Sequence, residues 1–208
     1  PIGVEIAREH AAGAGEVDRR RVAVNGNRYT DRRAIVQVID KLPAARRETL
    51  AGRFRSSTPP IDRRDVSEDG TEKFLIALQD GRQVESVFIP RTPHDTFCVS
   101  TQVGCAMGCA FCLTATMGLV RNLTAGEIVG QVRALAGALD LRDSRFNIVF
   151  MGMGEPLHNY DATMAAVRIL TDEHGFAVHP RRITVSTVGL VPAMERLAEE
   201  DVMPRLAV

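Results

Sequence analysis

The stretch FCVSTQVGCAMGCAFC, residues 97–112, decides the fold class of this chain. It opens with a short apolar run, residues 97–100, which predicts a strand, and it continues into a loop rich in glycine and cysteine. All four cysteines of the 208-residue chain fall inside this stretch, namely Cys98, Cys105, Cys109 and Cys112. Because the sequence shows no secretory signal, we expect these cysteines to take part in metal or redox chemistry in the cytoplasm rather than in a disulfide framework.

Strand and helix patterns alternate after this stretch. A capping box, Thr124 to Glu127, predicts the start of a first helix, which runs to about Leu139. Repeated β/α units predict an α/β fold with a parallel sheet, here a partial barrel of about four units within residues 93–208. The further strands are expected at residues 146–150, 183–186 and 203–208, and the further helices at about 162–170 and 191–199.

The chain before residue 93 divides into two predicted regions. Residues 1–64 carry 14 Lys+Arg against 8 Asp+Glu, and we expect residues 1–60 to form a basic, helical accessory region that binds RNA. Its helices are expected within residues 32–54 and divided at Pro43. A solvated arginine-rich face would explain the charge equally well. Residues 61–92 are expected to form a linker and a β-hairpin, with strands at residues 73–79 and 83–89.

The overall composition is that of an ordinary globular protein. The chain is 45% hydrophobic and 25% charged, and its formal net charge is zero. These values argue against a disordered or fibrous chain. No apolar run approaches the roughly 20 residues of a membrane-spanning helix. We therefore expect no membrane partner.

The C-x3-C-x2-C spacing of Cys105, Cys109 and Cys112 points to an iron–sulfur cluster. Three thiolates leave a tetrahedral zinc site incomplete, but they can hold three irons of a cubane cluster and leave one iron open. The spacing, placed after the first strand of a β/α series, resembles the radical S-adenosylmethionine superfamily. A zinc site completed by Cys98 or a histidine, and a set of reduced thiols, are the alternatives.

A second candidate site follows the next predicted strand. Gly152 and Gly154 are expected to let a ligand approach the backbone, and Glu155 can accept hydrogen bonds from an ammonium group. Ser186 ends the third strand and is expected on the same rim, because ligands of β/α barrels bind at the carboxyl ends of the strands. Taken alone, these features are common turn and strand-end residues.

Several runs narrow the resemblance to the RlmN/Cfr family of radical S-adenosylmethionine RNA adenosine methyltransferases. The likeness extends from about residue 68 to the end, and the preceding region corresponds loosely to the family's helical accessory domain. The family's Gly-Met-Gly-Glu-Pro-Leu motif is complete. The matching runs are residues 69–71, 97–105, 121–124, 127–132, 152–157 and 181–187.

The resemblance implies a role for each matching residue. Glu85 matches the glutamate proposed as proton acceptor, and Cys98 matches the cysteine that resolves a covalent protein–RNA intermediate through a disulfide. The reaction implied is methylation of adenine C2 by way of a methyl-cysteine. Cys105, Cys109 and Cys112 would ligate a 4Fe-4S cluster, and Gly154, Glu155 and Ser186 would bind S-adenosylmethionine.

The resemblance also implies the partners. They are 23S ribosomal RNA, with transfer RNA as a further candidate, and an electron donor such as flavodoxin or ferredoxin; no DNA is expected. C8 methylation by a resistance-type member, another radical enzyme with a non-RNA substrate, and a non-enzymatic iron–sulfur or zinc module stay open as alternatives.

One family feature is absent from the sequence. The family carries its methyl-bearing cysteine in its C-terminal region, and no cysteine follows Cys112 here. The strand expected at residues 203–208 would also lack a neighbour on one side. We therefore expect a fragment that forms no methylated adenosine by itself.

Overall fold

The computed structural model describes residues 43–46, 49, 58–91, 94–142, 144–173 and 175–208. Residues 44–46, directly after Pro43, are helical. Apart from residues 43–46, 49 and 58–60, the predicted accessory region lies outside the described residues, so the predicted division into domains stays a prediction.

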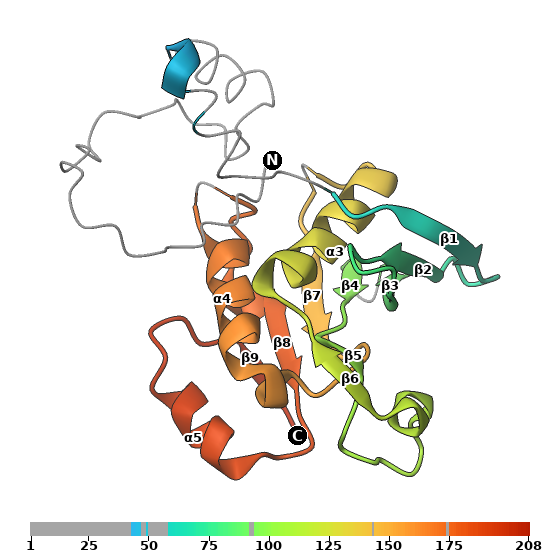
Figure 1. Ribbon diagram of the computed structural model, residues 1–208, viewed down its shortest axis with the longest axis vertical. Coiled ribbons are helices and arrows are strands. Elements are labelled where there is room, and N and C mark those ends of the chain that lie inside the picture. Colours follow the sequence, from blue (N-terminus) through green and yellow to red (C-terminus); the bar gives the residue numbers. More distant parts are fainter. Residues whose placement is uncertain (1–42, 47–48, 50–57, 92–93, 143, 174) are drawn as a thin grey trace.

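The described part of the chain is built on one seven-stranded sheet (Figure 1). Three antiparallel strands, β1 to β3, continue without interruption into four parallel strands, because β3 pairs with β4. The predicted α/β fold with a parallel sheet is therefore confirmed. The strands in spatial order are β1 (Ile61–Val66), β2 (Glu72–Ala77), β3 (Gln83–Ile89), β4 (Thr96–Cys98), β7 (Asn147–Phe150), β8 (Ile183–Ser186) and β9 (Arg205–Ala207).

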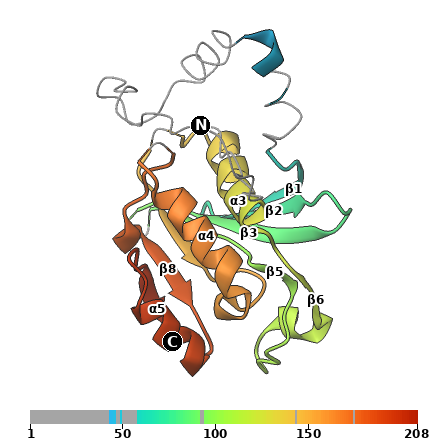
Figure 2. The same cartoon turned by 60° about the vertical axis from the view of Figure 1, so that its left-hand side comes forward.

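Three helices connect the parallel strands (Figure 2). They are α3 (Ala125–Ala138), α4 (Tyr160–Thr171) and α5 (Val191–Ala198). The predicted capping box is present, since the Thr124 side chain accepts from the Glu127 backbone and the Glu127 side chain accepts from the Thr124 backbone. Where about four units were expected, three β/α units are complete and β9 follows. No helix in the described ranges is long and apolar enough to cross a membrane.

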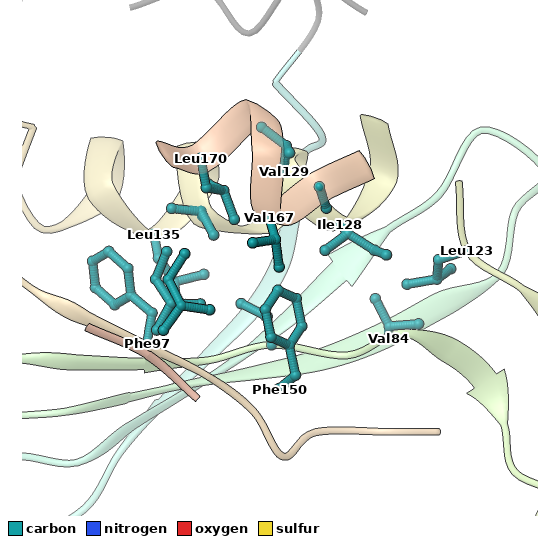
Figure 3. Packing of buried hydrophobic residues seen from close by; sticks show 14 of the residues in the cluster. Val84, Phe97, Leu123, Ile128, Val129, Leu135, Phe150, Val167 and Leu170 are labelled. Atoms are coloured by element: carbon teal, nitrogen blue, oxygen red, sulfur yellow. The ribbon is translucent and has the colours of Figure 1, made fainter. Parts of the chain in front are cut away.

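The core lies between the sheet and the helices α3 and α4. Figure 3 shows Phe97 and Phe150 of the sheet facing Leu135 of α3 and Val167 of α4. Alternate strand residues point into this core: in β7, Ile148 and Phe150 are buried while their neighbours are half-buried. Burying one apolar face in this way fixes the register of each strand, because a shift by one residue would expose it. The opposite face of the sheet does not take part in this core.

Two pairings were not predicted. The segment expected to be a linker forms β1, an edge strand held by a two-pronged ion pair between Arg64 and Glu72 and by stacking of Arg64 over Phe74. Its sequence is mostly charged, which hides the strand pattern but suits an exposed sheet edge. The loop expected around the cysteines contains a second, two-stranded sheet of β5 (Gln102–Gly104) and β6 (Leu119–Asn122).

Candidate functional site

The two-stranded sheet of β5 and β6 forms the base of the cysteine loop. The Cys105 N–H donates to the Gly118 carbonyl at 3.0 Å and closes this base. Gly104 has a φ of +76°, and a Cβ there would lie 1.8 Å from the Gly118 oxygen. Only glycine permits this crossing of the two loop ends. The loop is therefore anchored at its base by backbone contacts.

The tip of this loop is open. Cys105 is buried, whereas Cys109 and Cys112 are half-buried, and all three are free thiols. Phe111 is 93% exposed and Leu113 is 83% exposed. Among the described residues, no group of three or more His, Cys, Asp and Glu side chains is gathered around one point as a metal site.

The donor set nevertheless fits an iron–sulfur cluster. Three thiols on one anchored loop, two of them accessible to solvent, are the ligand type that such a cluster requires. The fourth cysteine, Cys98, lies on β4 and outside this loop. The tip carries apolar side chains that nothing in the described chain covers, as expected for a loop that closes around a bound group.

The Gly152–Glu155 segment is fastened to the chain that follows β4. The Met153 carbonyl accepts from the N–H groups of Thr101 and Gln102, at 2.8 and 3.1 Å. The Met153 N–H donates to Ser100 Oγ, and the Glu155 N–H donates to Gln102 Oε1. These bonds join the ends of β4 and β7 at the carboxyl edge of the sheet, where the second site was predicted.

The packing of the chain itself also requires the two glycines of this segment. A Cβ at Gly152 would lie 2.8 Å from the backbone of Val99, and a Cβ at Gly154, where φ is +100°, would lie 2.5 Å from the Gln102 side chain. The space beside both glycines is filled by protein. Glycine is required here for the close approach of two chain segments, and any ligand contact of Gly154 is made by its backbone.

The Glu155 carboxylate connects two loops of this rim. It is 3% exposed, its Oε1 accepts from the Leu157 N–H, and its Oε2 accepts from the Val188 N–H, both at 2.9 Å. It thus ties the end of β7 to the loop after β8. A carboxylate has about four acceptor positions, so both oxygens retain a lone pair for a further donor.

The remaining predicted residues share one face of the sheet. Val84 and Ser86 of β3, like Phe97 of β4, are buried on the helix side, so Glu85 and Cys98 point the other way. Cys98 is paired with Val87, two residues from Glu85 on the adjacent strand. Ser186 lies on this same face at the end of β8, and among the described residues its hydroxyl has no hydrogen-bond partner. We call this surface the open face.

The electrostatic settings of Glu85 and Cys98 differ. Glu85 is about half exposed and forms an ion pair with Lys73, with Nζ 3.1 Å from Oε1. Burial raises the pKa of the Cys98 thiol to about 11, although a hydrogen bond with the Met151 backbone acts in the opposite sense. Cys98 is therefore a neutral thiol at pH 7, and it becomes a nucleophile only where a bound group or base takes its proton.

Three buried polar side chains support this site and were not predicted. Gln131 of α3 accepts from the Ser100 N–H and from Ser86 Oγ, and it donates to the Ser100 carbonyl at 2.9 Å. Ser100 Oγ donates to the Glu85 carbonyl at 2.5 Å. Gln102 bridges Glu155 and Asn122. The sequence signal was a glutamine within the apolar face of α3, beside Ile128 and Leu135.

Arg121 fixes the outer side of the site. It binds the Glu127 carboxylate with both terminal nitrogens and Asp80 Oδ2 through Nε at 2.7 Å. The Arg121 guanidinium holds the pKa of the Asp80 carboxyl well below its usual range. These bonds connect β6, the start of α3 and the turn between β2 and β3. Glu85 lies on β3 of the same hairpin.

A sheet with three thiols on one loop and a glycine–glutamate rim at its carboxyl edge is the arrangement of radical S-adenosylmethionine proteins. Residues 99–208 match the model of the Radical SAM superfamily. This match covers more than half of the chain, and the chain belongs to that superfamily.

Within it, the matched proteins are RNA methyltransferases by name. The dual-specificity RNA methyltransferase RlmN of Pelobacter propionicus is 54% identical over 144 residues, covering 69% of this chain and 40% of the relative. The probable RlmN of Gemmatimonas aurantiaca is 43% identical over 200 residues, covering 96% of this chain and 55% of the relative. The chain spans about half the length of the curated relatives it matches.

A solved structure agrees. The crystal structure of a radical SAM methyltransferase from Sphaerobacter thermophilus has a TM-score of 0.73 and 47% identity, and the match covers 82% of this chain and 50% of that one. The resemblance to the RlmN/Cfr family drawn from the motifs is thereby confirmed.

Proposed function

We propose that this chain provides the cofactor-binding part of an RNA methyltransferase that acts on C2 of an adenosine in 23S ribosomal RNA, with transfer RNA as a second substrate. The observation that carries the proposal is the open face, on which Glu85 and Cys98 lie on adjacent strands. RNA as the substrate class is supported by the names of the relatives. Cytoplasmic location and a flavodoxin or ferredoxin as electron donor belong to the same proposal.

The proposed roles follow from the positions of the residues. Cys105, Cys109 and Cys112 would hold a 4Fe-4S cluster. The backbone of Gly154 and the side chain of Glu155 would bind S-adenosylmethionine, with Glu155 using its free lone pairs for the cofactor's ammonium group. When bound, these groups supply reductive cleavage and the methyl group.

The open face would act on the base. Ser186 has a free hydroxyl there and would contact the cofactor. Glu85 is accessible and would take the ring proton of the adenine, while Lys73 keeps its carboxylate oriented. Cys98 would resolve the covalent protein–RNA intermediate, for which its thiol must first lose a proton. The target adenosine must be unstacked to reach this face.

A chimera tests the proposal. The 200 residues of this chain that match the Gemmatimonas aurantiaca relative replace the corresponding part of that relative, and the product is incubated anaerobically with labelled cofactor, a reductant and unmodified 23S RNA or transfer RNA. We expect 2-methyladenosine by nucleoside mass spectrometry, and its loss in the Cys98→Ala and Glu85→Gln chimeras. Modified RNA carrying 8-methyladenosine would refute the C2 assignment, and an iron-loaded chimera that leaves RNA unmodified would refute the RNA assignment.

A further inference from the structure

A basic cleft lies at the end of the parallel strands opposite the cysteine loop. It has a volume of about 410 Å³. Asn147 begins β7, Arg182 directly precedes β8 and Arg205 begins β9, so the lining is formed by the amino-terminal ends of neighbouring strands. The proposed methyl-transfer residues lie at or toward the other end. The remaining lining residues are His94, His179 and Arg181.

The guanidinium groups in this cleft have no counter-charge. Within the described ranges, Arg181, Arg182 and Arg205 make no ion pair, and no carboxylate lines the cleft. The Arg182 Nη1 is buried and has no hydrogen-bond partner. A buried donor without an acceptor is costly, and like charges held close together repel one another, although Arg181 and Arg205 are exposed to solvent.

Several arginines outside the cleft are paired with carboxylates. Arg64 and Arg121 each bind a carboxylate with two nitrogens, and Arg196 pairs with Asp161 at 2.7 Å. The cleft thus brings together three arginines that make no ion pair within the described ranges. Its charge and its unused donors call for an anion rather than a neutral ligand.

Histidine adds a donor to this lining. The Arg181 N–H donates to Nδ1 of His179 at 3.1 Å, so the proton of the neutral ring is on Nε2. The cleft therefore combines three planar guanidinium groups with an imidazole N–H and the Asn147 amide. Guanidinium forks match the spacing of phosphate oxygens, which they bind in pairs.

We propose that this cleft binds a phosphate group, supplied either by an RNA backbone or by a free phosphate ion. The first source rests on the proposed function, whereas the second is independent of it. Such a site would lie outside the methyl-transfer site and would contribute affinity and orientation without contact with the reacting atoms.

Titration with inorganic phosphate tests the site itself. We expect binding to the 208-residue chain by calorimetry at low salt, and a roughly tenfold or greater loss of affinity in both Arg182→Gln and Arg205→Gln. Arg63→Gln is the matched control, because Arg63 lies on β1 with its side chain 70% exposed and pairs with Asp65. The Arg182→Lys variant keeps the charge and is expected to bind with intermediate affinity. Thermal unfolding confirms that each variant is folded.

A second arm identifies the source of the phosphate. A short single-stranded RNA without terminal phosphates is titrated at several salt concentrations. If RNA is the source, Arg182→Gln lowers the salt slope by about one, whereas an unchanged slope with lost phosphate binding assigns the cleft to a free phosphate. Absence of phosphate binding by the parent chain, or binding by both glutamine variants with the affinity of the parent chain, overturns the proposal. No arm requires iron or methyl transfer, so failure of the proposed function is separately visible.

Discussion

The cysteine loop and the Gly152–Glu155 segment meet the same edge of the sheet, yet they are held in opposite ways. The cysteine loop is anchored only at its base, and its tip exposes Phe111 and Leu113 to solvent. The Gly152–Glu155 segment is bonded along its length to the chain after β4, and its glutamate is buried. The Gly152–Glu155 segment is thus held in place by protein contacts, whereas the tip of the cysteine loop is not.

This difference follows from the chemistry of the ligands. A metal cluster forms bonds strong enough to order a loop when it binds, so the protein need not order the loop beforehand. A cofactor recognised by hydrogen bonds gains most from donors and acceptors that are already in place. We therefore expect substitutions in the loop to alter metal content, and substitutions in the Gly152–Glu155 segment to alter folding.

The largest effect is expected in the loop. Cys105→Ala, Cys109→Ala and Cys112→Ala should each abolish iron incorporation, because three ligands are the minimum for the cluster. Iron and sulfide analysis after anaerobic reconstitution measures this, with Cys98→Ala as the control that retains iron. Stoichiometric zinc in the parent chain would contradict the assignment.

The next largest effect is a loss of stability at Gly154, which we compare with Gly108 because both glycines have a positive φ. Gly154→Ala should lower the free energy of unfolding by about 3–5 kcal/mol, because its Cβ would collide with Gln102 and the φ of +100° disfavours alanine. Gly108→Ala, in the cysteine loop, has open space around it at a φ of +68° and should cost only about 1–2 kcal/mol. Urea denaturation of both variants without iron measures the difference. Equal costs would remove the distinction between the two regions.

Glu155 provides a smaller test of the same segment. Glu155→Ala should cost about 2–3 kcal/mol, because the N–H groups of Leu157 and Val188 would lose their acceptor in a buried place. Glu155→Gln keeps one carboxamide oxygen and should cost less. Glu155→Gln should also weaken the binding of S-adenosylmethionine, which calorimetry on the reconstituted chain measures. Its iron content should be unchanged. Full cofactor affinity in this variant would exclude Glu155 from the cofactor site.

The smallest effect depends on pH and concerns the open face. The folded chain holds the Cys98 thiol protonated to about pH 11, whereas an unfolded thiol ionises near pH 9. Folding stability from this group is therefore complete below about pH 9 and is lost as pH rises toward 11, by roughly 2 kcal/mol. Unfolding measured from pH 8 to 11 should show a steeper loss in the parent chain than in Cys98→Ala. Parallel curves would mean that Cys98 is not desolvated.

Much of the fold was predictable from local pattern. The helix α3 begins at the predicted capping box, and β3 occupies the residues expected for the second hairpin strand. These signals are short in range: a cap, a turn and an alternation of apolar residues are complete within a few positions. The strand β1 was not predicted, because an edge strand made mostly of charged residues lacks that alternation.

The sequence by itself determined which residues carry the chemistry, because thiol spacing and a glycine–glutamate run are local properties of the chain. Tertiary structure alone decided what surrounds them. It placed Glu85 on the strand adjacent to Cys98, two residues from the residue that pairs with Cys98. It also filled the space next to Gly154 with Gln102, and it joined Ser100 to Gln131, which lies 31 positions further along the chain. Strand register and helix packing set these contacts, and both arise from the burial of one sheet face, which no short segment of the sequence encodes.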